Sequence, residues 1–179
     1  MLDITVEDLS NQAAELDTYI DYYNKIAKPV VDNYSRDLDD KMIQITEYID
    51  RVKKYNIGYD SVTIQRHLME LSAIVYFTNE NLEKVGLRDD IAQLVYKTNY
   101  NEAYLTKQGK NDAGTKYSVK QLEAFAEREA LSDSIVKFLY SRAYKILSAK
   151  VESADTMLRT LSKILSALIA DMQTTGRYN

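Results

Sequence analysis

Apolar residues recur at intervals of three and four along almost the whole chain, which is the spacing of one face of an α-helix. The most regular run lies near the C-terminus, where the steps alternate four and three without a break. It comprises Leu147, Val151, Ala154, Leu158, Leu161, Leu165, Leu168 and Met172, which we call the C-terminal stripe. No strand-like alternation of any length accompanies it. The pattern predicts an all-α fold of long helices, with a coiled-coil or bundle helix at the C-terminus.

Start and stop signals divide the first half of the chain into separate helices. One helix should run from about residue 5 to 27. Pro29 then marks a break or a first helical turn, and a second helix should continue to about residue 55, with Gly58 as its C-terminal cap. Asp60 or Ser61 should cap the start of the third helix.

The second half of the chain is predicted to be helical around one loop. Gly86 should end the third helix, and a fourth should run from about 88 to 107. The segment 107–117 contains two Gly, an Asn and an Asp, and is the expected loop. Ser118 and Gln121 then form a capping box that should open a last helix of about 57 residues.

The C-terminal stripe needs a partner, because a helix that long cannot fold back on itself. It could pack on the preceding helices in an intramolecular antiparallel bundle, or on copies of itself. Its apolar face is wider than a two-stranded seam, which favours higher-order bundles. We therefore expect a homo-oligomer, and the intramolecular bundle remains the alternative. The residues that widen the face are Ile146, Met157, Ile164 and Ile169.

Charge is unevenly distributed along a chain whose net charge is −4. Residues 1–59 carry twelve acidic and seven basic residues, whereas residues 60–179 carry fifteen acidic and sixteen basic residues. We therefore distinguish an acidic N-terminal helical segment, 1–58, from a helical domain, 59–179, whose local excess of bases leaves nucleic-acid binding open. With no Cys, no signal-like start and no long apolar run, the chain is expected in the cytoplasm, away from membranes.

Residues suited to catalysis are scarce. His67 is the only histidine, so no His pair or His-based triad exists. Asp39-Asp40 and Asp89-Asp90 are adjacent pairs, and adjacent residues on a helix point about 100° apart, so neither pair makes a two-carboxylate site. No phosphate-binding, dinucleotide-binding or calcium-binding motif occurs. We expect no enzyme activity, no metal site and no cofactor.

Tyrosine is abundant, with fifteen residues against three Phe and no Trp. Tyr96, Tyr100 and Tyr104 lie four apart on one helical face, beside Lys97 and leading to Lys107. Aromatic rings with interleaved bases can stack single-stranded bases and hold phosphates. The same tyrosines could instead fill the boundary layer of a helical core. A second group of bases could follow phosphates or form an ordinary polar face: Arg142, Lys145, Lys150, Arg159 and Lys163.

From Tyr59 onward the order of elements resembles the T4-type phage recombination mediators, the UvsY-like family. The similar stretches are "YDSVTIQRHLMELSAIVYFTNENLEKVGLRDDIAQLVYKTNYNEAYL", the Gly-containing loop, and "FAEREALSDSIVKFLYSRAYKILSAKVESADTMLRTLSKILSALIADM". The resemblance lies in spacing, length and residue character. It implies a non-enzymatic, ring-forming homo-oligomer that binds single-stranded DNA. Its partners would be a RecA-like recombinase and single-strand-binding protein, in the cytoplasm of a phage-infected cell.

The resemblance also implies where DNA would bind, around the central loop. Family members carry clustered Lys and Arg before this loop, where the present chain reads "YKTNYNEAYLTKQGK". The bases that carry over from the resemblance are Lys97, Lys107 and Lys110. With Lys116 and the aromatic face added, the expected DNA-binding set is Lys97, Tyr100, Tyr104, Lys107, Lys110 and Lys116. A second hypothesis, favoured by the acidic segment 1–58, is a helical structural or adaptor protein, such as a virion component or an inhibitor that binds a host protein.

Overall fold

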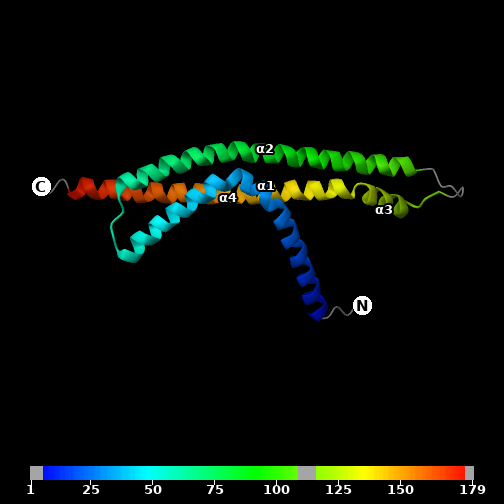
Figure 1. Ribbon diagram of the computed structural model, residues 1–179, viewed down its shortest axis with the longest axis horizontal. Coiled ribbons are helices and arrows are strands. Elements are labelled where there is room, and N and C mark those ends of the chain that lie inside the picture. Colours follow the sequence, from blue (N-terminus) through cyan, green and yellow to red (C-terminus); the bar gives the residue numbers. More distant parts are fainter. Residues whose placement is uncertain (1–5, 109–115, 176–179) are drawn as a thin grey trace. The chain divides into compact units, whose positions relative to one another are not determined.

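The computed structural model describes residues 6–108 and 116–175, without the side chains of residues 6–17, 19 and 175. Four helices follow one another: α1 (Val6–Tyr55), α2 (Ser61–Lys107), α3 (Val119–Glu129) and α4 (Leu131–Thr175) (Figure 1). No strand occurs in these ranges. The predicted all-α fold of long helices is confirmed.

The chain divides into two compact units, and each unit is built from separate segments. The first unit contains residues 1–30 and 84–145, and the second contains 31–83 and 146–179. Each unit therefore takes a part of α1, α2 and α4, whereas α3 belongs to the first unit alone. The acidic segment 1–58 contributes to both.

The second unit is a bundle of three helical segments, in which α2 runs antiparallel to α1 and α4 (Figure 1). All three segments contribute side chains to one core. Burying one Leu or Ile side chain stabilises the fold by roughly 1.5–3 kcal/mol, so this shared layer holds the segments together. The core residues are Leu38, Ile45, Ile64, Leu71, Val75, Val151, Ala154 and Leu161.

Most of the C-terminal stripe packs against other helices of the same chain. Leu147, Val151, Ala154 and Leu161 are buried, and Leu158 and Leu165 pack partly buried against the core of the second unit. The cover decreases toward the C-terminus, where Leu168 is half-buried and Met172 is 59% exposed. Most of the stripe thus forms the intramolecular bundle that its pattern left open. Assembly of copies through the stripe stays a prediction that concerns its exposed end.

Pro29 lies inside α1, so the expected division into two helices is wrong. Proline lacks a backbone N–H and costs about 3 kcal/mol in a helix interior. Ala27 and Val31, which flank the proline, are both buried. Tertiary packing on either side therefore holds α1 through a residue that would end an isolated helix.

Gly86 does not end a helix either, because α2 continues through it to Lys107. A Cβ atom at position 86 would lie 3.1 Å from Cε2 of Tyr144 in α4. The missing side chain therefore lets the tyrosine ring approach the α2 backbone within the first unit. Gly86 is a close-packing position, and the predicted stop is wrong.

The turn between α1 and α2 is capped on both sides. Asn56 adopts a left-handed conformation with φ 50°. The N–H of Asn56 donates to the Lys53 carbonyl at 3.4 Å and that of Ile57 to the Val52 carbonyl at 3.2 Å, the pattern of a Schellman motif. Asn56, and not the predicted Gly58, is therefore the left-handed cap residue.

The start of α2 agrees with prediction. The Asp60 carboxylate accepts hydrogen bonds from the backbone N–H of Thr63 at 2.9 Å and from its hydroxyl at 2.5 Å. These bonds, the hydroxyl first, lower the pKa of Asp60. The side chain thus satisfies an N–H that the helix cannot, and the proposed N-cap at Asp60 is confirmed.

The predicted last helix of about 57 residues is instead two helices. The capping box of Ser118 and Gln121 is confirmed at the start of α3. The helical conformation is interrupted at Ala130, although 2.9 Å hydrogen bonds join Ala130 to Ala126 and Ser134 to Ala130. No Pro or Gly causes this interruption. Ala130 is fully buried where the two helices meet.

Candidate functional site

The residues predicted to bind DNA belong to the first unit, at the end of α2 and before α3. Lys110 lies outside the described residues. Lys97 and Lys116 are exposed, as expected of residues that contact phosphates. The remaining three are half-buried: Tyr100, Tyr104 and Lys107.

The tyrosine face of α2 is occupied by the chain itself. The rings of Tyr96 and Tyr100 lie 6.1 Å apart, and Nζ of Lys137 in α4 lies 4.4 Å from the Tyr96 ring centre. Burial raises the pKa of the Tyr100 hydroxyl, and the carboxylates of Glu123 and Glu127 in α3 raise it further. Carboxylates beside the rings repel phosphate, so this arrangement fits the core-boundary interpretation of the tyrosines better than a stacking platform.

Lys107 is also engaged within the first unit. Its Nζ lies 4.7 Å from the ring centre of Phe125 in α3, a cation–π contact. Of the five described members of the predicted set, Lys97 and Lys116 are exposed. These five residues do not form one open aromatic and basic site.

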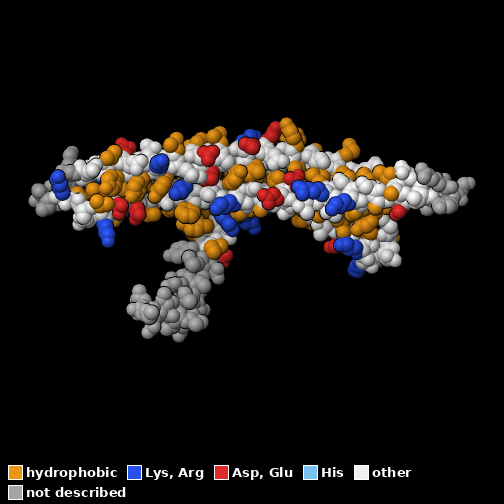
Figure 2. All heavy atoms as spheres, turned by 180° about the vertical axis from the view of Figure 1, so that it is seen from behind, with side chains coloured by type: hydrophobic (Ala, Val, Ile, Leu, Met, Phe, Trp, Pro, Cys, Tyr) orange, Lys and Arg blue, Asp and Glu red, His pale blue; other side chains and the backbone are white. Residues whose placement is uncertain are grey.

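A different surface of the first unit is open and apolar. Leu87, Ile91, Leu94 and Leu105 of α2 are each more than half exposed. At 100° per residue they fall on one face, away from the buried Val85 and Ala92. In Figure 2, orange hydrophobic side chains accordingly stand along the upper edge, where α2 runs in Figure 1. We call the four residues the α2 outer face.

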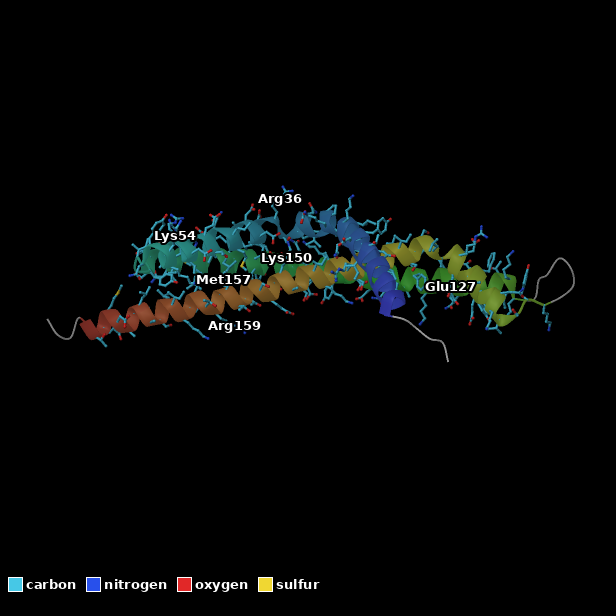
Figure 3. The ribbon with its side chains drawn as sticks, turned by 90° about the horizontal axis from the view of Figure 1, so that it is seen from below. Arg36, Lys54, Glu127, Lys150, Met157 and Arg159 are labelled. Atoms are coloured by element: carbon cyan, nitrogen blue, oxygen red, sulfur yellow. The ribbon has the colours of Figure 1, made fainter. Side chains whose placement is uncertain are left out.

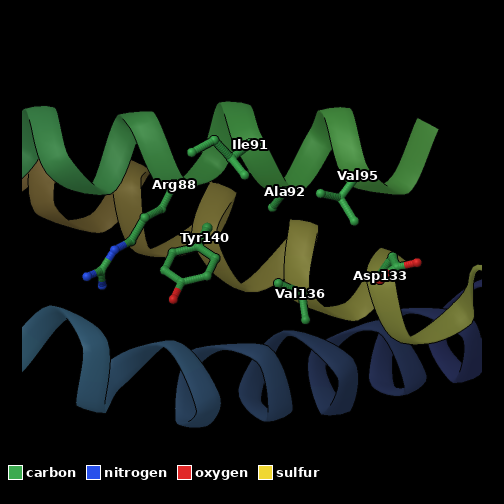
Figure 4. A pocket seen from close by; sticks show the side chains of 7 residues that line it. All are labelled: Arg88, Ile91, Ala92, Val95, Asp133, Val136 and Tyr140. Carbon is green, nitrogen blue, oxygen red and sulfur yellow. The ribbon is translucent and has the colours of Figure 1, made fainter. Parts of the chain in front are cut away.

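A cavity of about 240 Å³ lies beside this face, between α2 and α4 of the first unit. Its walls are apolar except at two ends, where Arg88 and Asp133 stand (Figure 4). Asp133 accepts a 2.7 Å hydrogen bond from the Asn99 amide. A cavity of this size takes one large apolar side chain. The apolar lining comprises Ile91, Ala92, Val95, Val136 and Tyr140.

The second group of bases, on α4, was considered for phosphate binding, and some of its members already bind side chains of the same chain. Arg142 donates to the Asn24 side chain at 2.8 Å. In the second unit, Nζ of Lys150 donates to Ser35 at 3.0 Å and pairs with Asp39, and its side chain points toward α1 (Figure 3). Arg159 points away from the bundle and is exposed. Two of these bases, Arg142 and Lys150, therefore connect α4 to α1 and contribute to the fold.

His67 lies in the second unit, with its ring 5.4 Å from that of Tyr48. Burial lowers the pKa of the imidazole, and the charge of Lys41 lowers it further. Lys41 is itself buried and paired with Glu70 of α2. Among the described residues, no group of three or more acidic, His or Cys side chains is placed to hold a metal ion. This histidine fits a structural role in the helix interface.

The α2 outer face is not among the sites that the sequence predicts, although its residues Ile91, Leu94 and Leu105 lie in the helix expected over 88–107. The structure shows that α2 has apolar residues on two faces, with Val85 and Ala92 on the buried one. A helix that is apolar on opposite sides needs two partners, and this was the available clue.

Comparisons with known proteins identify no relative of this chain, because no protein-family model, curated protein or solved structure matches it. No helix in the described ranges combines the length and apolar character needed to cross a membrane.

Proposed function

We propose that this chain is a non-enzymatic binding protein, a helical adaptor or scaffold that acts through protein–protein contact. The observation that supports this proposal is the apolar surface of the first unit, formed by the α2 outer face and the adjacent cavity. Contiguous exposed apolar patches larger than a few hundred Å² often mark the sites where proteins bind partners. The surface lies on long helices held by packing, which suits a contact that must keep its shape.

The shape and chemistry of the cavity favour an amphipathic helix as the ligand. Such helices insert apolar side chains at spacings of three and four into a groove between two helices. Here the groove is formed by α2 and α4, and its walls are apolar between Arg88 at one end and Asp133 at the other.

A library of helical peptides displayed on phage, selected against the intact chain, tests this proposal. We expect the selected peptides to be amphipathic and to lose at least tenfold in affinity when Val136→Glu places a charge in the cavity. Val136 is 44% exposed, so the fold should tolerate the change. Ile43→Glu, at a 56% exposed position of the second unit, is the matched control. Equal loss in both variants, or no selected peptide, would contradict the proposal.

A second candidate function is the single-stranded-DNA-binding recombination mediator that the family resemblance implies. Residues 84–145 carry eleven basic and eight acidic residues, and Lys97 and Lys116 are exposed among them. Binding would then rest on phosphate contacts, with the tyrosines supporting the fold. The recombinase and single-strand-binding protein would be further partners.

Fluorescence anisotropy with a labelled oligothymidylate between 50 and 200 mM salt tests this second candidate. Each phosphate contact contributes roughly 0.7 to the slope of log affinity against log salt for single strands. Lys97→Gln with Lys116→Gln should therefore reduce the slope by about 1.4. Lys163→Gln, an exposed base of the second unit, is the control and should change the slope less. No binding at the lowest salt would reject the mediator and leave the adaptor.

A further inference from the structure

We propose that the α2 outer face pairs with the same face of a second copy, as a short parallel coiled coil in register. This inference rests on the proposed function, because it names one protein that the exposed surface binds. The segment involved runs from Leu87 to Leu105, and all of it belongs to the first unit.

The spacing on the α2 outer face is that of a coiled-coil seam. Exposed residues follow one another in steps of four, three, four, three and four. Seams of this kind form when such positions are apolar and meet those of a second helix. Four of the six are large and apolar, and the two polar ones lie together. In order they are Leu87, Ile91, Leu94, Thr98, Asn101 and Leu105.

The order of apolar and polar positions favours parallel, in-register pairing. In that arrangement each position faces its own copy, so that apolar side chains meet apolar ones and Asn101 meets Asn101. This register keeps the polar side chains of Thr98 and Asn101 together and away from the apolar positions, where they would lack hydrogen-bond partners. Antiparallel pairing about the centre of the segment would instead place Ile91 opposite Asn101 and Leu94 opposite Thr98, which leaves apolar groups against polar ones.

The charged residues at the edges of the seam also favour parallel pairing. Lys97 and Glu102 are exposed on opposite edges of the α2 outer face and are five residues apart. In a parallel coiled coil, edge positions separated by five residues lie across the interface from each other. Two-fold symmetry would therefore form the Lys97–Glu102 pair twice. In the antiparallel arrangement, Lys97 would face Lys97 of the second copy and repel it.

The interface is preformed, which lowers the cost of pairing. A free peptide of this length would have to fold before it could pair, but α2 is already held as a helix by its buried opposite face. The segment is about 28 Å long, at 1.5 Å per residue. A seam this short supports a weak, concentration-dependent dimer, so the measurements should extend from about 1 to 200 μM.

Cysteine cross-linking tests the pairing directly, because the chain contains no Cys. Leu94→Cys should form disulfide-linked dimers under mild oxidation, since each Leu94 faces its own copy. Ile43→Cys is a matched control with similar exposure in the second unit, and it should remain monomeric. Cross-linking that occurs only when Leu94→Cys is mixed with Thr98→Cys would overturn the parallel arrangement.

Charge exchange tests the orientation without relying on the core of the seam. Lys97→Glu and Glu102→Lys should each weaken dimerisation by about tenfold in analytical ultracentrifugation, because attraction becomes repulsion at two symmetric places. The double variant should recover to within about twofold of the natural chain. Failure to recover would overturn the assigned pairing.

Leu94→Glu separates this inference from the proposed function. It should abolish the dimer and, at concentrations where the natural chain is monomeric, leave the thermal melting curve unchanged within error, because Leu94 is 64% exposed. A natural chain that is monomeric at every concentration overturns the inference. If that monomer still binds the selected helical peptides through the Val136 cavity, the proposed adaptor function stands without self-pairing.

Discussion

Gly86 and Tyr144 show how a single residue reverses a prediction from sequence. Glycine costs a helix about 1 kcal/mol relative to alanine, so Gly86 was expected to end α2. The ring of Tyr144 packs where a side chain at position 86 would lie. Close packing of α2 and α4 therefore offsets part of the cost in helix propensity, and a pattern along one helix cannot reveal this packing.

We predict that Gly86→Ala stabilises the chain by about 0.5 kcal/mol, less than the full helix propensity of about 1 kcal/mol. The added Cβ meets Cε2 of Tyr144 at 3.1 Å, but this tyrosine is 38% exposed and its ring can move outward. Urea denaturation measures the change. In a Tyr144→Ala background, the same substitution should give the full gain. A loss of stability in both backgrounds would show that the crowding involves more than the ring.

His67 is expected to make stability depend on pH. The pKa of the imidazole is lowered from 6.5, by burial first and then by Lys41. The unfolded chain therefore binds the proton first as pH falls, and the free energy of unfolding decreases through about pH 6.5. The loss is complete below the folded pKa. Asp60 and Glu70, whose pKa values are also lowered, lose their contributions only below their ordinary values near 4.

Urea midpoints at pH 7.5 and pH 5.5 measure this dependence. His67→Gln should remove most of the difference between the two, because glutamine does not titrate. Glu70 raises the pKa of His67 and partly opposes the burial, so Glu70→Gln should enlarge the difference. A His67→Gln variant with the same difference as the natural chain would place the dependence on other groups.

At the scale of helices, the sequence predicted the starts better than the ends. Asp60 and Ser118 act as predicted, because an N-cap needs only a short side chain that reaches an N–H nearby. Pro29 and Gly86 were read as ends and are not, because packing from distant segments outweighs their local preference. The interruption at Ala130 could not be predicted, since no Pro or Gly marks it in the sequence.

Asn56 provides a test of the helix end. Its φ of 50° is left-handed, which costs most residues roughly 1–2 kcal/mol and costs glycine nothing. Asn56→Ala should therefore lower the free energy of unfolding by about 1 kcal/mol, and Asn56→Gly should leave it equal or higher. Thermal melts of both variants measure this order. Gly58→Ala is the control and should have little effect, because a Cβ there meets nothing within 4 Å. Equal melting temperatures for the two Asn56 variants would contradict the assigned cap.

At the scale of the whole molecule, the main role of the C-terminal stripe is to stabilise the fold of the single chain. Leu161 is fully buried, so Leu161→Ala should lower the free energy of unfolding by about 3 kcal/mol, through lost burial and the cavity left behind. Met172→Ala is the matched control on the same stripe. It is 59% exposed and should cost less than about 0.5 kcal/mol. Urea denaturation with the mass measured by light scattering distinguishes folding from assembly.

The candidate site was predicted less well than the fold. A helical period reports which residues share a face, and it identified both the tyrosine face and the C-terminal stripe. The period does not report whether such a face packs against the chain's own helices or remains exposed. Tyr100 and Leu161 pack within the chain, whereas Leu94 is exposed. Burial depends on contacts between remote segments, so the working surface could only be found in three dimensions.

The interleaving of the two units also has a consequence for biosynthesis. Both units take a segment of α4, which is synthesised after α1, α2 and α3. Neither unit can therefore complete its packing before its segment of α4 has emerged, although domains usually fold in order of synthesis. Nascent chains stalled before residue 131 should remain sensitive to protease throughout, and resistance should arise only in nascent chains long enough to expose α4.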